Sequence, residues 1–211
     1  MDDGVEVYAA SVTDGNFSNW ALSGIGVGSM TLEAINGNPG ARLNVSTFTT
    51  LSSFAYGTGI DLDVTTSQAL SGIFSLSLDV ESGAGDFGAG QAIALLVQQG
   101  SNIYGEFLGN TGFPQASFST LTFGGTFTSS LFTRWVGSGP ALPDFTGATA
   151  TMFGFSAYNA DNNRSLTKYY DNFNLTYTSA TPEPSTWLLF GGTGLAMLLF
   201  LQLPPFHRTR K

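Results

Sequence analysis

The sequence of 211 residues contains no cysteine. Without thiols the chain forms no disulfide framework, and it offers neither a cysteine nucleophile nor a zinc–thiolate site. Its length suits one domain of moderate size with an ordinary hydrophobic core. Hydrophobic residues make up 42% of the chain, which argues against intrinsic disorder.

Charged residues are also scarce, at 10% of the chain against roughly 25% in an average globular protein. Seven Lys and Arg residues stand against 15 Asp and Glu residues, which gives a formal net charge of −8. A sparse, acidic surface does not neutralise phosphate groups, so we expect no nucleic-acid partner.

The chain has a single histidine, His207, close to its C-terminus. A Ser-His-Asp triad therefore has no histidine available in the body of the chain. Asp61 and Asp63 fall on one face of an extended segment, and such a carboxylate pair is the remaining route to a hydrolase, of the glycosidase type. Two acids on a solvated loop are the commoner explanation, and we predict that the protein is not an enzyme.

The few charges are unevenly distributed. Residues 1–181 carry four basic and fourteen acidic side chains, a net charge of −10, whereas residues 182–211 carry three basic side chains and one acidic one, a net charge of +2. An acidic body with a small basic tail indicates that the tail has a separate role.

The tail contains a long apolar run. Seventeen residues from Trp187 to Leu203 carry no charge, and a helix of this length, about 25 Å, is at the lower limit for crossing a membrane. The basic residues Arg208, Arg210 and Lys211 follow the run and favour the cytoplasmic side, which places the acidic body outside. A buried core helix, a lipid-anchor signal and a plain single-span anchor are the alternatives.

Pro182-Glu183-Pro184 stands directly before this run, and its two prolines keep the junction extended. The order of Pro-Glu-Pro, apolar helix and basic end resembles the PEP-CTERM sorting signal of Gram-negative bacteria that export exopolysaccharide. The resemblance implies a first location in the inner membrane. It also implies recognition of the motif by an exosortase, which cuts near it and sends the body to the cell surface or the medium.

Export also requires an N-terminal signal. Met1-Asp2-Asp3-Gly4 offers neither a basic region nor an apolar stretch, so we expect a misplaced start or a trimmed leader, and a cytoplasmic protein is the third alternative.

The body, residues 1–180, is dominated by strand patterns. Apolar and polar residues alternate in 73–80, and the same period of two appears in 153–157 and 173–177. Further strands are predicted at 5–12, 30–35, 42–48, 92–98, 102–108, 117–123, 126–136 and 149–158. No segment before residue 185 shows a sustained helical period. The sequence predicts an all-β, antiparallel β-sandwich of the jelly-roll kind, followed by one transmembrane helix in residues 181–211.

The two ends of the body carry a second resemblance. Residues 14–20 (DGNFSNW) are similar to the opening of carbohydrate-binding modules, and residues 169–176 (YYDNFNLT) are similar to their closing strand. Aromatic faces stack on sugar rings, and Trp135 is the candidate we favour because a Gly-Ser-Gly-Pro loop follows it closely. We expect Trp20 to lie in the core.

Asp171 stands two residues before Phe173, so the period of two predicts that both face the core. A buried carboxylate needs hydrogen-bond donors or a metal. In the modules that the sequence resembles, the equivalent aspartate helps to hold a structural calcium ion, which implies a Ca²⁺ site at Asp171 with Glu6 or Asp14. An aspartate that caps backbone amides without a metal is the alternative.

Two functions follow from these patterns. The first is an exported cell-surface or matrix protein with a structural or adhesive body, whose partners are an exosortase and the inner membrane. The alternative is a carbohydrate-binding module that recognises an exopolysaccharide.

Overall fold

The computed structural model describes residues 7–14, 17–25, 28–48, 55–83, 90–112, 116–159 and 165–180. Residues Val7–Ala180 form one compact unit. The described residues form twelve strands in two six-stranded sheets, together with the short 3-10 helix η1 (Ser129–Leu131).

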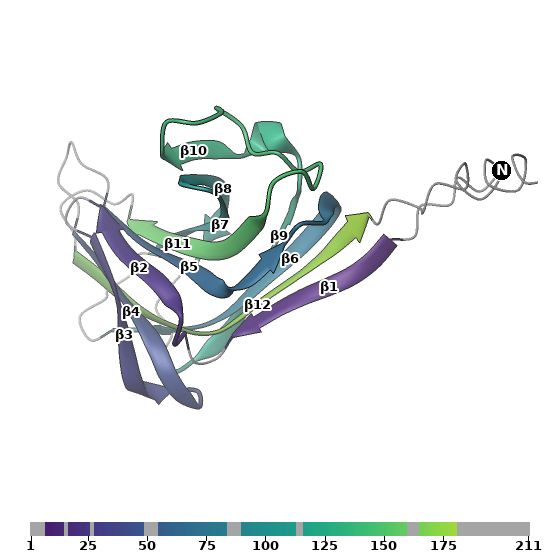
Figure 1. Cartoon of the computed structure of the whole chain (residues 1–211). Helices are drawn as coiled ribbons and strands as arrows, with labels where there is room; N and C mark the ends of the chain where they lie inside the picture. The colour runs from purple at the N-terminus through teal and green to yellow at the C-terminus, as the bar shows by residue number, and fades with distance from the viewer. Residues whose placement is uncertain are drawn as a thin grey trace, which may run out of the picture. The chain divides into compact units, whose positions relative to one another are not determined.

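Sheets A and B make up this unit, and every strand pair in them is antiparallel (Figure 1). Sheet A has the order β3 (Gly28–Gly37), β4 (Gly40–Phe48), β12 (Ser165–Ala180), β6 (Ala69–Ser82), β9 (Ser119–Thr126), and β1 (Val7–Asp14) also pairs with β12. Sheet B has the order β10 (Thr133–Val136), β8 (Asn102–Asn110), β7 (Ala92–Gln99), β11 (Thr151–Asn159), β5 (Ala55–Thr66), β2 (Trp20–Ile25).

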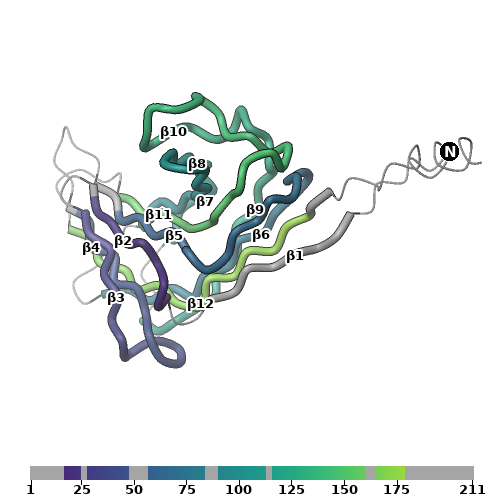
Figure 2. The backbone as a smooth tube through the Cα atoms, in the orientation of Figure 1, coloured from purple at the N-terminus to yellow at the C-terminus, as the bar shows by residue number. Residues whose placement is uncertain are grey.

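The backbone trace shows how β12 connects the parts of sheet A (Figure 2). The first half of β12 pairs with β4, and its second half pairs with β1 on the same side, while β6 lies along the other side for most of its length. In sheet B, β7 and β8 separate β10 from β11.

The core follows from the predicted alternation. In β6 the side chains of Phe74, Leu76, Leu78 and Val80 are buried, and in β11 those of Phe153, Phe155 and Ala157 are fully buried. Both rows belong to one hydrophobic cluster, so the inner faces of the two sheets pack against each other. The described residues confirm the antiparallel β-sandwich.

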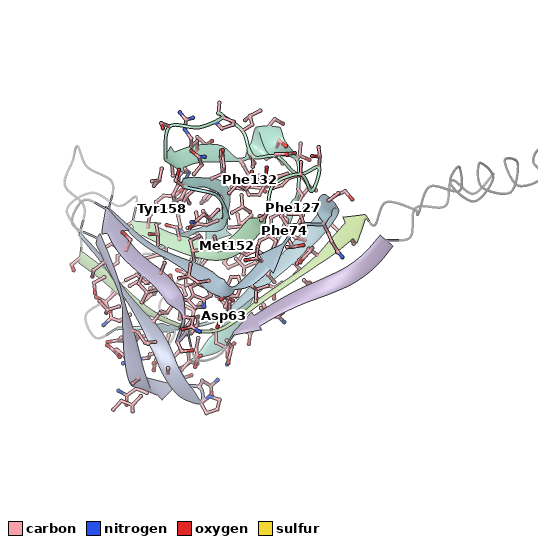
Figure 3. The ribbon with its side chains drawn as sticks, in the orientation of Figure 1. Asp63, Phe74, Phe127, Phe132, Met152 and Tyr158 are labelled. Carbon is pink, nitrogen blue, oxygen red and sulfur yellow. The ribbon has the colours of Figure 1, made fainter. Side chains whose placement is uncertain are left out.

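Two groups of aromatic rings fill this core. Phe127 packs against Phe74, Phe132 and Phe145 with ring centroids 5.0 to 6.4 Å apart, and Figure 3 labels three of these rings. Trp20 is 8% exposed and packs edge to face against Phe17, Phe155 and Phe173. The predicted core position of Trp20 is confirmed.

The sequence reading missed two strands, β2 and β5. β5 contains Gly57 and Gly59, and glycine is typical of loops. Here both positions need glycine because the packing leaves no room for a Cβ atom. A Cβ atom on Gly59 would lie 2.7 Å from Cε3 of Trp20, and one on Gly57 would lie 2.7 Å from Cγ1 of Val45. The single strand predicted at 126–136 is also wrong in its middle, because η1 interrupts the segment before β10.

Candidate functional site

The register of sheet B fixes which of its side chains point away from the core. Because Phe153, Phe155 and Ala157 of β11 point inward, the residues between them and Tyr158 point outward. Directly paired residues share a face, and this outward face continues through β7 and β8. Its members on the three strands are Met152, Gly154, Ser156, Tyr158, Ala92, Ala94, Leu96, Gln98, Ile103, Gly105, Phe107 and Asn110.

Trp135 lies at a β-bulge in β10, because the pairing with β8 shifts register between Arg134 and Val136. Its indole ring lies over Gly105. A Cβ atom on Gly105 would stand 2.6 Å from Cε2 and 2.7 Å from Cζ2 of the indole. The missing side chain of Gly105 is therefore what lets the indole lie against the outward face of sheet B.

Tyr158 and Phe107 come to the same place from β11 and β8. The ring centroids of Trp135 and Tyr158 are 6.4 Å apart at an interplanar angle of 81°, and those of Phe107 and Tyr158 are 6.1 Å apart at 57°. Phe107 is 58% exposed, and the other two rings are partly exposed. We call Trp135, Tyr158 and Phe107 the aromatic surface. Tyr158 and Met152 mark opposite ends of β11 in Figure 3.

Small and aliphatic side chains form the floor beneath the aromatic surface. Leu96 and Ala94 point outward yet are fully buried. They pair with Gly154 and Ser156 of β11. The Ser156 hydroxyl donates a 2.9 Å hydrogen bond to the carbonyl oxygen of Gly57. The outward face of sheet B is therefore also apolar, and the aromatic rings on it are partly exposed to solvent.

The outward face of sheet A is different. Ser75, Ser77, Thr122 and Thr176 occupy its strands at positions between core residues. A shallow hollow of about 180 Å³ lies between β6 and β12, but its two aromatic rings, those of Phe74 and Tyr177, are buried in the core cluster. An exposed group of aromatic rings is therefore found on sheet B and not on the described part of sheet A.

The basic side chains of the described residues are engaged elsewhere. Arg42 forms salt bridges with Glu33 and Glu81, at 2.6 and 3.2 Å, on sheet A. Lys168 is fully buried and donates a 2.7 Å hydrogen bond to Ser82. Arg134 donates to backbone carbonyl groups of the turn that follows β10. Among the described residues, no Lys or Arg side chain is therefore directed toward the aromatic surface, where it could bind an anionic ligand.

Glu106 lies in β8 between Gly105 and Phe107 but points the other way, toward the core residue Leu95 with which it pairs. Its side chain is 9% exposed, and Oε2 has no hydrogen-bond partner among the described residues. Burial raises the pKa of the Glu106 carboxyl group from 4.5 to about 7. The Glu106 carboxyl group, on the opposite face of β8 from the aromatic surface, therefore has a pKa close to neutral pH.

Asp171 does not face the core, contrary to the prediction. It pairs with Asp79, which lies between the core residues Leu78 and Val80 and so points outward, and the register then shifts before Asn174. This β-bulge breaks the period of two on which the prediction rested. Asp171 is nevertheless fully buried.

Hydrogen bonds account for the burial of Asp171. Its Oδ2 accepts the backbone N–H of Asn38, and its Oδ1 accepts that of Asn172 at 2.7 Å. The neighbouring Asp79 accepts hydrogen bonds from Thr120 and from the Asn172 amide. Burial raises the pKa of Asp171, as does the charge of Asp79, while the two backbone amides oppose the rise.

These donors match the capping alternative better than a metal site. Both oxygens of Asp171 already accept amide protons, and the described residues contain no cluster of three or more acidic or histidine side chains that fits a metal ion. Glu6, and the side chain of Asp14, lie outside the described part of the chain. The calcium site stays a prediction.

The carboxylate pair Asp61 and Asp63 belongs to β5 rather than to a loop. Asp61 is 2% exposed, and its Oδ1 accepts the backbone N–H of Asp63 at 2.8 Å. Both oxygens of Asp63 accept the side-chain amide of Asn19, at 2.8 Å each. The two carboxylates therefore have structural partners.

The sorting motif Pro182-Glu183-Pro184, the apolar run from Trp187 to Leu203 and the basic tail lie outside the described residues. Among the residues that the structure describes, no helix is long and apolar enough to span a membrane.

No protein-family model matches the chain, and no curated protein matches it significantly. Several solved structures are similar. The family 11 carbohydrate-binding module of the cellulosomal cellulase Lic26A-Cel5E of Clostridium thermocellum is 19% identical over 79% of this chain and 94% of its own, with a TM-score of 0.47.

The same kind of module from Clostridium thermocellum, in complex with a β-1,3-1,4-mixed-linked tetrasaccharide, is 20% identical over 78% of this chain and 94% of its own, with a TM-score of 0.46. The CBM22-1 xylan-binding domain of Xyn10C from Paenibacillus barcinonensis is 11% identical over 86% of this chain and 100% of its own, with a TM-score of 0.45. The similarity is one of β-sandwich fold.

Proposed function

We propose that the body of this protein is a non-catalytic carbohydrate-binding domain, and that the aromatic surface of sheet B is its binding site. The observation that carries the proposal is the convergence of Trp135, Tyr158 and Phe107 from three strands onto one exposed patch. Exposed aromatic rings that lie on a preformed apolar floor are typical of a binding site.

The chemistry of the patch suits a sugar chain. The apolar faces of pyranose rings stack on aromatic side chains, while their hydroxyl groups need polar partners at the rim. Gln98 and Asn110 provide such groups at the ends of the outward face of sheet B, and each is already oriented by a hydrogen bond to nearby backbone, at 3.0 and 2.9 Å.

The charges favour a neutral glycan over an anionic one. Recognition of uronates or sulfated sugars normally uses Arg or Lys side chains in bidentate or paired contacts. The described basic residues Arg42, Arg134 and Lys168 are held by other partners, and the body carries a net negative charge. We therefore infer a neutral polysaccharide as the ligand.

Binding of the full chain to soluble polysaccharides tests the proposal. The protein is kept in a detergent without a sugar headgroup and titrated with mixed-linkage β-1,3-1,4-glucan and xylan, with alginate as an anionic control. Binding is expected for a neutral chain, and Trp135→Ala and Tyr158→Ala are each expected to weaken it about tenfold or more. Thr122→Ala and Thr176→Ala, on the outward face of sheet A, serve as matched controls.

Two results would overturn the proposal. One is the absence of binding to every neutral polysaccharide tested. The other is binding that survives the double substitution of Trp135 and Tyr158 in a variant whose circular dichroism spectrum is unchanged.

The tail supports a second, separate proposal about destination. We infer that residues 181–211 are a PEP-CTERM sorting signal, so that the body is displayed outside the inner membrane and then cut free or transferred by an exosortase. The support is the sequence order of motif, apolar run and basic end. Intact-mass measurement in a host that contains an exosortase tests it, because recovery of protein that keeps its C-terminal tail would contradict processing.

The calcium site at Asp171, with Glu6 or Asp14, is a third and independent proposal. Millimolar Ca²⁺ should raise the melting temperature, and the rise should vanish in Asp171→Ala. An unchanged melting temperature with and without a chelator leaves Asp171 as a backbone cap.

A further inference from the structure

The turn that follows β10 is held by side chains from the neighbouring strand β8. The Asn102 Oδ1 atom accepts the backbone N–H of Gly139 at 2.8 Å, and the Tyr104 hydroxyl donates to the carbonyl oxygen of Pro140 at 3.1 Å. Arg134, from β10 itself, donates to the carbonyl oxygens of Gly139 and Pro140. Residues 137–140 are therefore tied to the sheet at several points.

Asn102 fits this turn closely. Gly137 has a φ of +99°, and a Cβ atom on it would lie 2.3 Å from the Asn102 Oδ1 atom. A Cβ atom on Gly139 would lie 2.5 Å from the Asn102 Nδ2 atom. The other end of the Asn102 amide donates a 3.4 Å hydrogen bond to the carbonyl oxygen of Gln99, on the far side of the β7–β8 turn.

The turn begins immediately after the β-bulge that carries Trp135. The backbone on either side of a bulge sets the direction of the bulge residue, and here one flank is the Arg134 pairing with β8 and the other is Val136 followed by the turn. β10 is a four-residue edge strand, so its ladder alone fixes the bulge weakly. Asn102 restrains the outer flank together with Tyr104 and Arg134, and it also links the turn to the carbonyl oxygen of Gln99.

We propose that Asn102 is a positioning residue for Trp135: by holding the 137–140 turn against the β7–β8 turn, it fixes the indole in its place over Gly105. Asn102 acts through the turn and not through contact with the ligand. The effect on sugar binding rests on the function proposed above, whereas the effect on the indole does not.

The experiment observes the indole and the ligand separately. The full chain is labelled with 5-fluorotryptophan, and the ¹⁹F resonances of Trp20, Trp135 and Trp187 are assigned by single Trp→Phe substitutions. The spectrum and the affinity for mixed-linkage β-glucan or xylan are then measured for Asn102→Ala, for Asn102→Asp, and for the matched control Asn44→Ala on sheet A. Asn44 is likewise partly buried and donates a 2.8 Å hydrogen bond to Glu33.

In Asn102→Ala the Trp135 resonance is expected to shift or broaden while the Trp20 resonance stays in place, and the affinity is expected to fall about tenfold. Asn102→Asp keeps the acceptor for the Gly139 N–H but loses the donor to the Gln99 carbonyl oxygen, so both properties should lie between those of the wild type and those of Asn102→Ala. Asn44→Ala should change neither.

An unchanged Trp135 resonance in Asn102→Ala overturns the proposal, as does a loss in Asn102→Asp that equals the loss in Asn102→Ala. If no polysaccharide binds the wild type, the proposed function fails, but the resonance of Trp135 still decides the role of Asn102. Disappearance of the Trp20 resonance together with that of Trp135 signals general unfolding and also counts against a positioning role.

Discussion

The outward faces of the two sheets are built on the same strand geometry but present different chemistry to solvent. On sheet A, positions between core residues hold Ser and Thr, such as Ser77 in β6 and Thr122 in β9. On sheet B, the equivalent positions hold Leu96 and Ala94, which are fully buried, and the exposed ring of Phe107. Sheet A thus exposes much of its outward face, whereas sheet B buries most of both of its faces.

The two outward faces differ in how they interact with water, in a protein that has few charged residues. Hydroxyl groups hydrate much of the outward face of sheet A, beside the salt bridges of Arg42 with Glu33 and Glu81. The Thr176 hydroxyl, for example, donates a hydrogen bond to the carbonyl oxygen of Ser75. Sheet B instead keeps an apolar patch at the surface, which is costly in water unless a ligand covers it. The proposed binding site on sheet B rests on this asymmetry.

Glu106 on sheet B gives the largest expected effect, because its buried Oε2 atom has no hydrogen-bond partner among the described residues. Its pKa is raised from 4.5 to about 7 in the folded protein, so its contribution to stability is complete below pH 4.5 and is lost as the pH rises through 7. Between pH 5 and pH 8 the free energy of unfolding should fall by about 2 to 3 kcal/mol. Urea unfolding at both pH values measures this change.

Glu106→Gln should remove most of that pH dependence. Glu33→Gln on sheet A is the control. Burial alone would raise the pKa of Glu33, but hydrogen bonds from Asn44 and Arg42 lower it below 4.5, so its titration falls outside this pH window. An equally steep fall in Glu106→Gln would show that another group causes it.

Two glycines offer the next comparison, because each lies on an outward face. A Cβ atom on Gly105 of sheet B would stand 2.6 Å from the rigid indole of Trp135, whereas the nearest heavy atom to one on Gly124 of sheet A is 3.9 Å away. Gly105→Ala should lower the free energy of unfolding by about 2 kcal/mol and displace the indole. Gly124→Ala should stay within about 0.5 kcal/mol of the wild type.

Thermal unfolding of both glycine variants provides the measurement. Equal stability of the two would contradict the close contact between Gly105 and Trp135.

The smallest effects on stability come from the exposed apolar residues Phe107 and Ile73, which are 58% and 69% exposed on opposite sheets. Truncation of either to Ala should change the free energy of unfolding by less than about 1 kcal/mol, because little area is lost from the core. Phe107→Ala should weaken polysaccharide binding several-fold, since the ring belongs to the aromatic surface. Ile73→Ala should leave binding unchanged, and titration of both variants with the same polysaccharide compares them.

Much of the fold was predictable from local pattern. The alternation in β6 and β11 made the core rows visible, and the absence of a helical period excluded helical layers in the body. Trp20 was also assigned correctly to the core. These features depend on neighbours within a few residues, which a sequence displays directly.

The failures share a physical cause. Asp171 was placed on the wrong face because a β-bulge changes the period without leaving a clear local signal. β5 was missed because Gly57 and Gly59 make room for bulky residues of other strands. Tyr158 and Phe107 went unnoticed as partners of Trp135, although each is an aromatic residue at an outward position of a strand.

The sequence by itself determined the β-sandwich class, the acidic body with its hydroxyl-rich strands, and the presence of an uncharged apolar run followed by basic residues, because composition and short-range periodicity carry that information. Tertiary structure alone decided which face holds the exposed rings. Phe107 and Tyr158 are 51 residues apart in the chain. Strand order, one bulge and the absence of a side chain at Gly105 bring the ring centroids of Trp135 and Phe107 to 6.4 and 6.1 Å from that of Tyr158. Contacts of that kind depend on register between distant strands, and no local pattern encodes it.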